Sequence, residues 1–174
     1  LVQRGFAGLY LWLMRGKDRD LLIDKRAPRF QAGEVEPHYP PLVNNNQLND
    51  AQVEAVQKTL RMEDYLLVHG PPGSGKTLLI HALVRELVRR GQRVMIAAGT
   101  NTAIDNALKK IRSDENEPHI LRLGSPTRTD PELRSFTLEG LAPSQDLDTR
   151  IAQMQQALTE RSIVAGTATT WLSG

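Results

Sequence analysis

The sequence predicts an α/β fold with a parallel sheet flanked by helices, and three observations support this prediction. Short apolar runs typical of strands occur at residues 65–69, 93–98, 120–123 and 162–165. Amphipathic segments typical of helices separate these runs. A loop rich in Gly and Pro, residues 70–77, leads from an apolar run directly into a helical segment. Strands that alternate with helices along a chain favour parallel pairing, with helices covering the sheet.

The amino-acid composition excludes several classes of protein. Its 174 residues are 40% hydrophobic and 24% charged, which is typical of a globular domain. No apolar run reaches the roughly 18 residues of a membrane helix, so we expect no membrane partner. Cysteine is absent, which excludes disulfides and thiolate chemistry and fits an intracellular protein of the cytoplasm or nucleus. A net charge of +2 is too small to indicate nucleic-acid binding by itself.

The distribution of prolines predicts two regions. Residues 1–40 contain apolar runs around a polar turn, followed by a Pro-rich linker, and are predicted to be the end of a small β domain. Residues 41–174 hold the α/β pattern, with a polar, Pro-containing insertion at 113–146 that we expect to have little regular structure. The chain begins at Leu1 and stops at Gly174 after an apolar run. We therefore expect it to be a piece of a longer protein.

Capping residues and apolar spacing predict the helices. Asn49 or Asp50 can cap the first helix, and Gln52 stands three residues after Asn49, as in a capping box. Gly91 is expected to end the helix that follows the Gly/Pro-rich loop. Further helices are predicted around 103–111 and 147–158. The last carries an apolar stripe that we expect to pack into the core, formed by Leu147, Ile151, Met154 and Leu158.

The Gly/Pro-rich loop reads GPPGSGKT and fits the pattern G-x-x-x-x-G-K-[ST], the P-loop. Its glycines let backbone N–H groups approach a phosphate, and the following helix directs its positive end at the same anion. Lys76 supplies a cation for the β- and γ-phosphates, and Thr77 supplies a hydroxyl for nucleotide-bound Mg²⁺. A chance match is disfavoured because an apolar run precedes the loop and a helix follows it. The predicted nucleotide-binding residues are Gly70, Pro71, Pro72, Gly73, Ser74, Gly75, Lys76 and Thr77.

A P-loop enzyme also needs an acid, normally an Asp at the end of a neighbouring strand, to hold Mg²⁺. Asp105 falls inside a predicted helix, and the other acidic residues after Thr77 fall in loops or at a helix start. Asp24 ends an apolar run, but it precedes the loop and the linker. We therefore expect the acid to lie beyond Gly174, and the chain alone to bind nucleotide at best weakly and to hydrolyse it hardly at all.

Several short motifs occur in an order that resembles the first motor domain of superfamily 1 helicases of the 5′-to-3′ branch. This branch includes the nonsense-mediated-decay RNA helicase and the nuclease-helicase of Okazaki-fragment processing. Residues 48–52 (LNDAQ) look like the Q motif, and GPPGSGKT corresponds to motif I. Residues 93–108 (RVMIAAGTNTAIDNAL) look like motif Ia, and 166–170 (GTATT) like the Thr-rich motif that precedes the acidic motif II.

The resemblance implies a RecA-like P-loop NTPase domain that uses ATP and Mg²⁺. By match to the motifs, Gln52 contacts adenine, and Thr100, Asn101 and Thr167 lie along a single-stranded nucleic acid. Short hydroxyl and amide side chains suit hydrogen bonds to phosphates and sugars. From the residues alone, Asn101 or Thr102 could instead cap the helix that starts there.

The resemblance also implies the larger protein. A small β-barrel precedes the motor in this family, a second motor domain of the same chain completes it, and the parent unwinds DNA or RNA. The residues before the linker (LLIDKRAPRF) favour DNA, because they look like the nuclease-helicase branch. This piece alone is expected to bind nucleotide and not to unwind.

Two alternatives remain open at this point. Another P-loop ATPase, such as an AAA-type remodeller or loader, shares the loop but lacks the run TNTAIDNAL. A non-catalytic nucleotide-binding module that uses ATP only to order itself is the second alternative.

Overall fold

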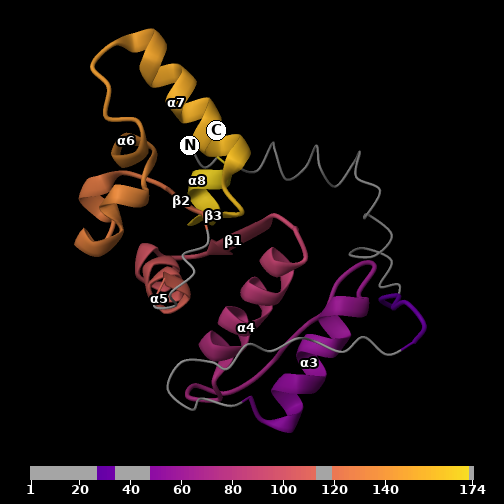
Figure 1. Ribbon diagram of the computed structural model, residues 1–174. Helices are drawn as coiled ribbons and strands as arrows, with labels where there is room; N and C mark the ends of the chain where they lie inside the picture. The colour runs from indigo at the N-terminus through magenta and orange to yellow at the C-terminus, as the bar shows by residue number, and fades with distance from the viewer. Residues whose placement is uncertain (1–26, 34–47, 113–118, 173–174) are drawn as a thin grey trace. The chain divides into compact units, whose positions relative to one another are not determined.

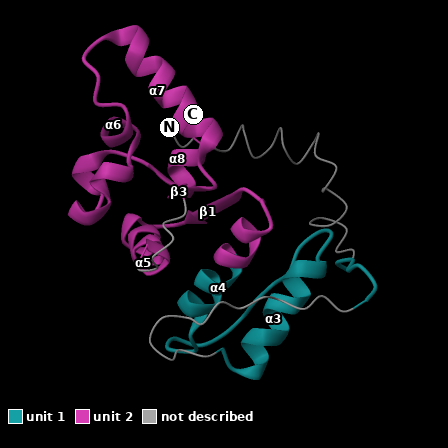
Figure 2. Cartoon of the chain, in the orientation of Figure 1, with its two compact units in different colours: residues 1–83, 173 teal, residues 84–172, 174 magenta. Residues whose placement is uncertain are grey.

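The computed structural model describes residues 27–33, 48–112 and 119–172. The strands predicted within 1–26, most of the linker and residues 113–118 of the insertion lie outside the described residues. The chain divides into two compact units, one formed by residues 1–83 and the other by residues 84–172 (Figure 2). The predicted boundary near residue 40 stays a prediction.

The first unit contains helix α3 (Asp50–Arg61) and the P-loop (Figure 1). Asn49 caps α3, and the capping box is complete: Asn49 Oδ1 accepts from the Gln52 N–H at 3.0 Å, and Gln52 Oε1 accepts from the Asn49 N–H at 2.9 Å. The predicted capping box is therefore confirmed. Helix α4 (Lys76–Arg89) starts within the loop motif and is followed by Gly91 at φ +74°, as the sequence predicted.

A short segment of the predicted linker is ordered against the end of α3. Phe30 and Met62 form an antiparallel bridge, and the Glu63 N–H donates to the Arg29 carbonyl at 3.1 Å. The Arg29 guanidinium donates two hydrogen bonds to the Asp64 carboxylate, at 3.1 and 3.0 Å. These contacts attach residues 29–31 to the first unit.

The strand predicted at residues 65–69 is absent from the structure. The described residues contain three strands, none of which includes this run. Leu67 is 84% exposed and Val68 is 46% exposed. The prediction was wrong because an apolar run becomes a strand only when a neighbouring strand pairs with it, and none of the described residues does so here.

The second unit is built on a three-stranded parallel sheet in the order β1-β3-β2. Its strands are β1 (Val94–Ala98), β2 (Ile120–Leu123) and β3 (Ile163–Thr167). Ile163 stands opposite Val94 on one side and Ile120 on the other, which sets the register of both pairs. The three runs predicted at 93–98, 120–123 and 162–165 are thereby confirmed as strands, and their pairing is parallel as predicted.

Helix α5 (Asn101–Arg112) packs against β1 and β3 and supplies much of the core. Leu108 and Ile104 are fully buried from the helix side, and Ile163 is fully buried from the sheet side. Burying apolar side chains of this size stabilises the unit by roughly 1.5–3 kcal/mol for each one. The core cluster consists of Val84, Ile104, Leu108, Ile111, Ile120, Leu133, Ile163 and Ala165.

The described part of the insertion is more regular than the sequence predicted. It forms the 3-10 helices η1 (Pro126–Arg128) and η2 (Pro131–Phe136) and the short helix α6 (Leu138–Leu141). A hydroxyl or carboxylate caps each of them, and Pro stands in the first turn of both 3-10 helices. Leu133 of η2 is fully buried in the core. The insertion therefore helps to build the domain.

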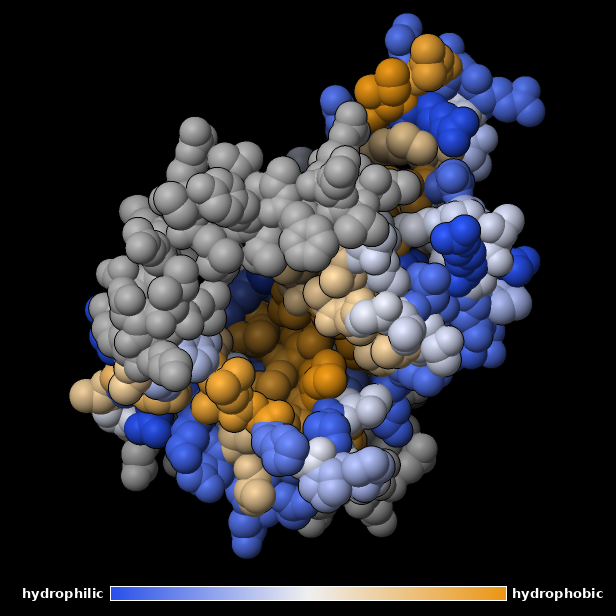
Figure 3. Space-filling model, turned by 180° about the vertical axis from the view of Figure 1, so that it is seen from behind, coloured by the Kyte–Doolittle hydropathy of each residue, from blue (hydrophilic) through white to orange (hydrophobic). Residues whose placement is uncertain are grey.

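Helix α7 (Leu147–Glu160) forms where predicted, but its apolar stripe is not a core face. Leu147 is 68% exposed, Ile151 45% and Leu158 42%. Ala157 is the residue of α7 that is buried. Figure 3 shows hydrophobic side chains at the surface in several places. The expectation of core packing was wrong because periodicity identifies an apolar face without saying what covers it.

Charged pairs attach η2 to α5. Lys109 Nζ lies 2.5 Å from Asp130 Oδ2, and Arg112 donates to the Glu132 carbonyl at 2.9 Å. The hydrogen bond from Lys109 is the main cause that lowers the pKa of Asp130. Desolvation opposes this shift, and the hydrogen bond from the Glu132 N–H lowers the pKa further. The same pair raises the pKa of Lys109.

We predict that Asp130→Asn destabilises the protein in a pH-dependent way. A lowered pKa in the folded state means that the contribution of Asp130 to stability is present above its unfolded value near 3.8. This contribution is lost as the pH falls through the folded pKa. Urea unfolding of both proteins should therefore show a difference in midpoint near neutral pH that shrinks on acidification. Asp148→Asn, at an exposed site on α7, is the matched control. A difference that stays constant with pH would contradict the prediction.

Candidate nucleotide site and strand edge

The P-loop borders a cavity of about 260 Å³ within the first unit. Its lining includes Gln52, His69, Gly70, Ser74 and Lys76. Lys76 Nζ donates to the carbonyls of Gly70 and Pro71, each at 2.6 Å, and lies 3.4 Å from Ser74 Oγ. The cation is thus held within the loop, at the start of α4. The positive end of that helix and the ammonium together favour an anion at this place.

Two glycines give the loop its shape. Gly73 and Gly75 have φ of +80° and +79°, a region that side chains strongly disfavour. A Cβ at Gly75 would also overlap Gln52 Nε2. The predicted P-loop residues 70–77 therefore lie together, with Thr77 exposed in the first turn of α4.

Gln52 joins the start of α3 to this loop. Its Nε2 donates to the carbonyls of Ser74 and Gly75, both at 3.3 Å, while its Oε1 completes the capping box. The side chain is 9% exposed. The capping pattern in the sequence predicted the local bond to Asn49. The bonds to the loop span 22 and 23 residues, so no local pattern could have predicted them.

The residues predicted to contact a nucleic-acid strand meet at the carboxyl edge of the sheet. Ala98, the last residue of β1, stands opposite Thr167 of β3, and Leu123 of β2 stands opposite Gly166. Thr100 and Asn101 follow β1 directly. The carboxyl edge of a parallel sheet is where ligands bind in open α/β folds. The structure therefore brings Thr100, Asn101 and Thr167 to one edge of the second unit.

The two threonines at this edge cap helices. Thr100 Oγ1 accepts from the Ala103 N–H at 3.3 Å at the start of α5. Thr167 Oγ1 accepts from the Thr170 N–H at 3.2 Å at the start of α8 (Ala168–Leu172). The alternative that Asn101 or Thr102 caps α5 is wrong, because Thr100 takes that role.

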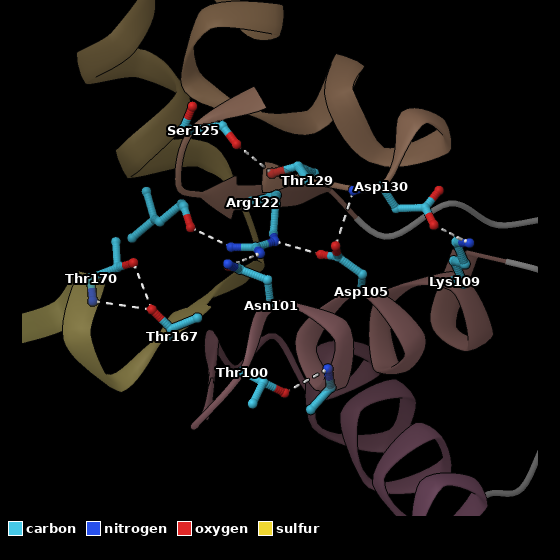
Figure 4. Close-up of polar contacts among 12 residues, drawn as sticks. Thr100, Asn101, Asp105, Lys109, Arg122, Ser125, Thr129, Asp130, Thr167 and Thr170 are labelled. Atoms are coloured by element: carbon cyan, nitrogen blue, oxygen red, sulfur yellow. Dashed lines mark hydrogen bonds and ion pairs between the residues drawn. The ribbon is translucent and has the colours of Figure 1, made fainter. Parts of the chain in front are cut away.

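Asn101 instead receives a hydrogen bond from a buried arginine (Figure 4). Arg122 Nη2 donates to Asn101 Oδ1 at 2.8 Å, and Arg122 Nε donates to Asp105 Oδ1 at 2.8 Å. The Arg122 side chain is 0% exposed and that of Asp105 8%. Neither residue was among the predicted site residues. The available signals were a charge within the apolar run 120–123 and an acid next to the apolar face of α5.

The sequence pattern of the AAA_11 family, described as an AAA domain, matches residues 47–170. The DNA replication ATP-dependent helicase/nuclease DNA2 of Saccharomyces cerevisiae is 39% identical over 119 residues, which cover 68% of this chain and 8% of that protein. DNA2 of Mus musculus is 35% identical over 154 residues, or 86% of this chain and 14% of that protein.

A third relative has a different name. The DNA polymerase alpha-associated DNA helicase A of Schizosaccharomyces pombe is 33% identical over 138 residues, which cover 79% of this chain and 19% of that protein. The chain therefore spans 8–19% of the length of these three relatives.

The parallel sheet and the P-loop define the class of protein as a P-loop NTPase with an α/β fold. The chain belongs to the AAA domain family AAA_11, in the superfamily 1 helicase type represented by DNA2, and forms the N-terminal portion of the motor. Within the described ranges, no helix is long and apolar enough to cross a membrane. The same ranges contain no group of three or more His, Asp or Glu arranged for a metal ion.

We predict that Gln52→Glu separates the two roles of this side chain. Glu keeps an oxygen for the capping bond to Asn49 but loses the donor and sets a carboxylate against the carbonyls of Ser74 and Gly75. Affinity for a fluorescent ATP analogue should fall about tenfold, while the helix content from circular dichroism stays unchanged. The control Gln57→Glu, which adds the same charge to α3 outside the cavity lining, should bind as the unaltered chain does. Unchanged affinity of Gln52→Glu would show that Gln52 does not shape the site.

Proposed function

We propose that this chain is the ATP-binding portion of an ATP-dependent helicase or translocase. The observation that carries the proposal is the P-loop cavity, in which Lys76 and the α4 N-terminus face the same space as Gln52. The parent protein is an enzyme that couples ATP hydrolysis to movement along a nucleic acid. This chain alone binds nucleotide and does not unwind.

The residues of the loop fit a nucleotide phosphate with its metal ion. Backbone N–H groups around Gly73 and Gly75 bind the phosphates, and Lys76 exchanges its bonds to the loop carbonyls for phosphate oxygens. Thr77 supplies a hydroxyl ligand for nucleotide-bound Mg²⁺. Gln52, which lines the cavity, contacts the adenine. When bound, Mg²⁺–ATP supplies the phosphoanhydride bond whose hydrolysis drives the motor.

A single-stranded nucleic acid is the proposed partner of the carboxyl edge of the sheet. Thr100, Asn101 and Thr167 present short hydroxyl and amide groups there, and such groups hydrogen-bond phosphates and sugars without reading bases. DNA is favoured over RNA because the relatives are named as DNA helicases. Their names also favour an intracellular parent that acts in the nucleus or cytoplasm.

The remainder of the parent chain is the second partner. A strand is moved by a cleft that opens and closes between two motor domains, and this chain contains part of one. The downstream part supplies the second domain, the acid that holds Mg²⁺ and the arginines that stabilise the transition state. The two alternatives, a ring-forming ATPase and a non-catalytic module, are not favoured by the family or by its relatives.

We predict that Lys76→Ala weakens ATP binding by about tenfold to a hundredfold, because it removes the cation that faces the phosphates. Equilibrium dialysis with Mg²⁺ and labelled ATP measures this. The matched control is Lys58→Ala, which removes an exposed lysine paired with Glu54 on α3. ATP turnover by the unaltered chain should be close to that of Lys76→Ala, because none of the described strands is followed directly by an Asp or Glu. Turnover well above that variant would contradict this and make Asp24, outside the described residues, the next acid to substitute.

We predict that Thr167→Val weakens binding of labelled oligo-dT several-fold and leaves ATP binding unchanged. The substitution removes little volume, but it takes away the hydroxyl that caps α8, so circular dichroism must first show an unchanged fold. Fluorescence anisotropy over a salt series measures it, and the salt dependence should stay the same because no charge is lost. Thr159→Val, which removes an exposed hydroxyl on α7, is the control. Equal effects of the two variants would argue against a strand contact at Thr167.

A further inference from the structure

Arg122 is the largest side chain that is fully buried among the described residues. A buried guanidinium is costly unless each of its donors finds an acceptor. Arg122 donates hydrogen bonds to three acceptors (Figure 4). Its Nε donates to Asp105 Oδ1 at 2.8 Å, its Nη1 to the Leu123 carbonyl, and its Nη2 to Asn101 Oδ1 at 2.8 Å. The arginine thus links an acid of α5, the end of β2 and the first residue of α5.

Asp105 is itself held at both oxygens. Its Oδ2 accepts from the Asp130 N–H at 3.0 Å, while its Oδ1 accepts from Arg122. The guanidinium is therefore fixed by a carboxylate that cannot easily rotate. Buried ion pairs of this kind add little net stability compared with apolar residues of the same volume. A role in orienting another group accounts for the pair better than stability does.

The group that the pair orients is the side-chain amide of Asn101. Arginine has only donors, so the atom of Asn101 that faces Nη2 must be the oxygen Oδ1. Because an amide is planar, fixing its oxygen also fixes the direction of Nδ2. Asn101 is partly exposed at the carboxyl edge of the sheet. Its two Nδ2 hydrogens are then the donors available to a ligand there.

We propose that the Arg122–Asp105 pair is a positioning device that presents Asn101 Nδ2 to the backbone of a bound single strand. This inference rests on the strand partner of the proposed function. Arg122 does not touch the strand, because its side chain is 0% exposed, and acts only through Asn101. A phosphate or sugar oxygen is the acceptor that suits a fixed amide donor.

The test compares Arg122→Lys, Asn101→Ala and the double variant in binding fluorescein-labelled oligo-dT. Lysine keeps a charge for Asp105 but cannot reproduce the three-way fork of arginine, so it releases Asn101. Each single variant should bind about tenfold more weakly, as expected for one hydrogen bond to a charged group. The double variant should bind no more weakly than Asn101→Ala, because both changes remove the same contact.

Two further readouts separate positioning from a merely structural role. Affinity for ATP and the salt dependence of strand binding should be unchanged in Arg122→Lys, because neither the P-loop nor a phosphate-contacting charge is altered. Arg93→Lys is the matched control. Arg93 also belongs to the second unit and donates to backbone carbonyls, those of Leu158 and Arg161, at 2.5 and 3.3 Å. It should bind the strand as the unaltered chain does.

The outcomes distinguish this inference from the proposed function. If Asn101→Ala binds oligo-dT normally, the strand contact itself is refuted, and the positioning role with it. If Asn101→Ala is weakened but folded Arg122→Lys binds normally, or if the two effects add, only the positioning role is refuted.

A measurement on the unaltered chain covers the case in which Arg122→Lys does not fold. The NMR order parameter of the Asn101 side-chain amide, measured without a strand, should approach the rigid value of about 0.85. A value below about 0.6 overturns the proposal. The side-chain amide of the exposed Gln155 on α7 serves as the internal flexible reference.

Discussion

Parallel pairing of β3 with β1 on one side and β2 on the other is the constraint on which the second unit depends. Because Ile163 stands opposite both Val94 and Ile120, the three strands end at the same edge. The loop after β1, the end of β2 and the start of α8 are brought together by this register alone. Residues separated by more than 60 positions, such as Asn101 and Thr167, thus share one edge of a sheet.

The same register explains why a charge can be buried at the end of β2. Arg122 stands opposite Ala165 in the middle strand, with Asp105 approaching from α5. The insertion completes the arrangement, since Asp130 N–H holds the second oxygen of Asp105 and Lys109 holds the carboxylate of Asp130. A segment that reads as a polar loop is in this way joined to the part of the molecule proposed to contact nucleic acid.

In the first unit, the side chain of Gln52 connects the start of α3 to the P-loop. Gln52 uses its oxygen to start α3 and its nitrogen to hold two carbonyls of the P-loop. The glycine at position 75 is required both by its backbone angle and by the nearness of Gln52. The Q motif and the P-loop, which the sequence presents as separate patterns, form one hydrogen-bonded structure around the proposed nucleotide site.

The sequence by itself determined the features that depend on neighbouring residues: the capping box at Asn49, the P-loop, the helices α3, α4, α5 and α7, and three of the four strands predicted within the described residues. These follow from local hydrogen bonds and from apolar periodicity. Only the tertiary structure decided that residues 65–69 are not a strand and that Leu147 is exposed. The first depends on whether another strand pairs with the run, and the second on whether another element covers that face of α7. It also decided the Arg122–Asp105–Asn101 contacts, since these join residues that no spacing rule relates.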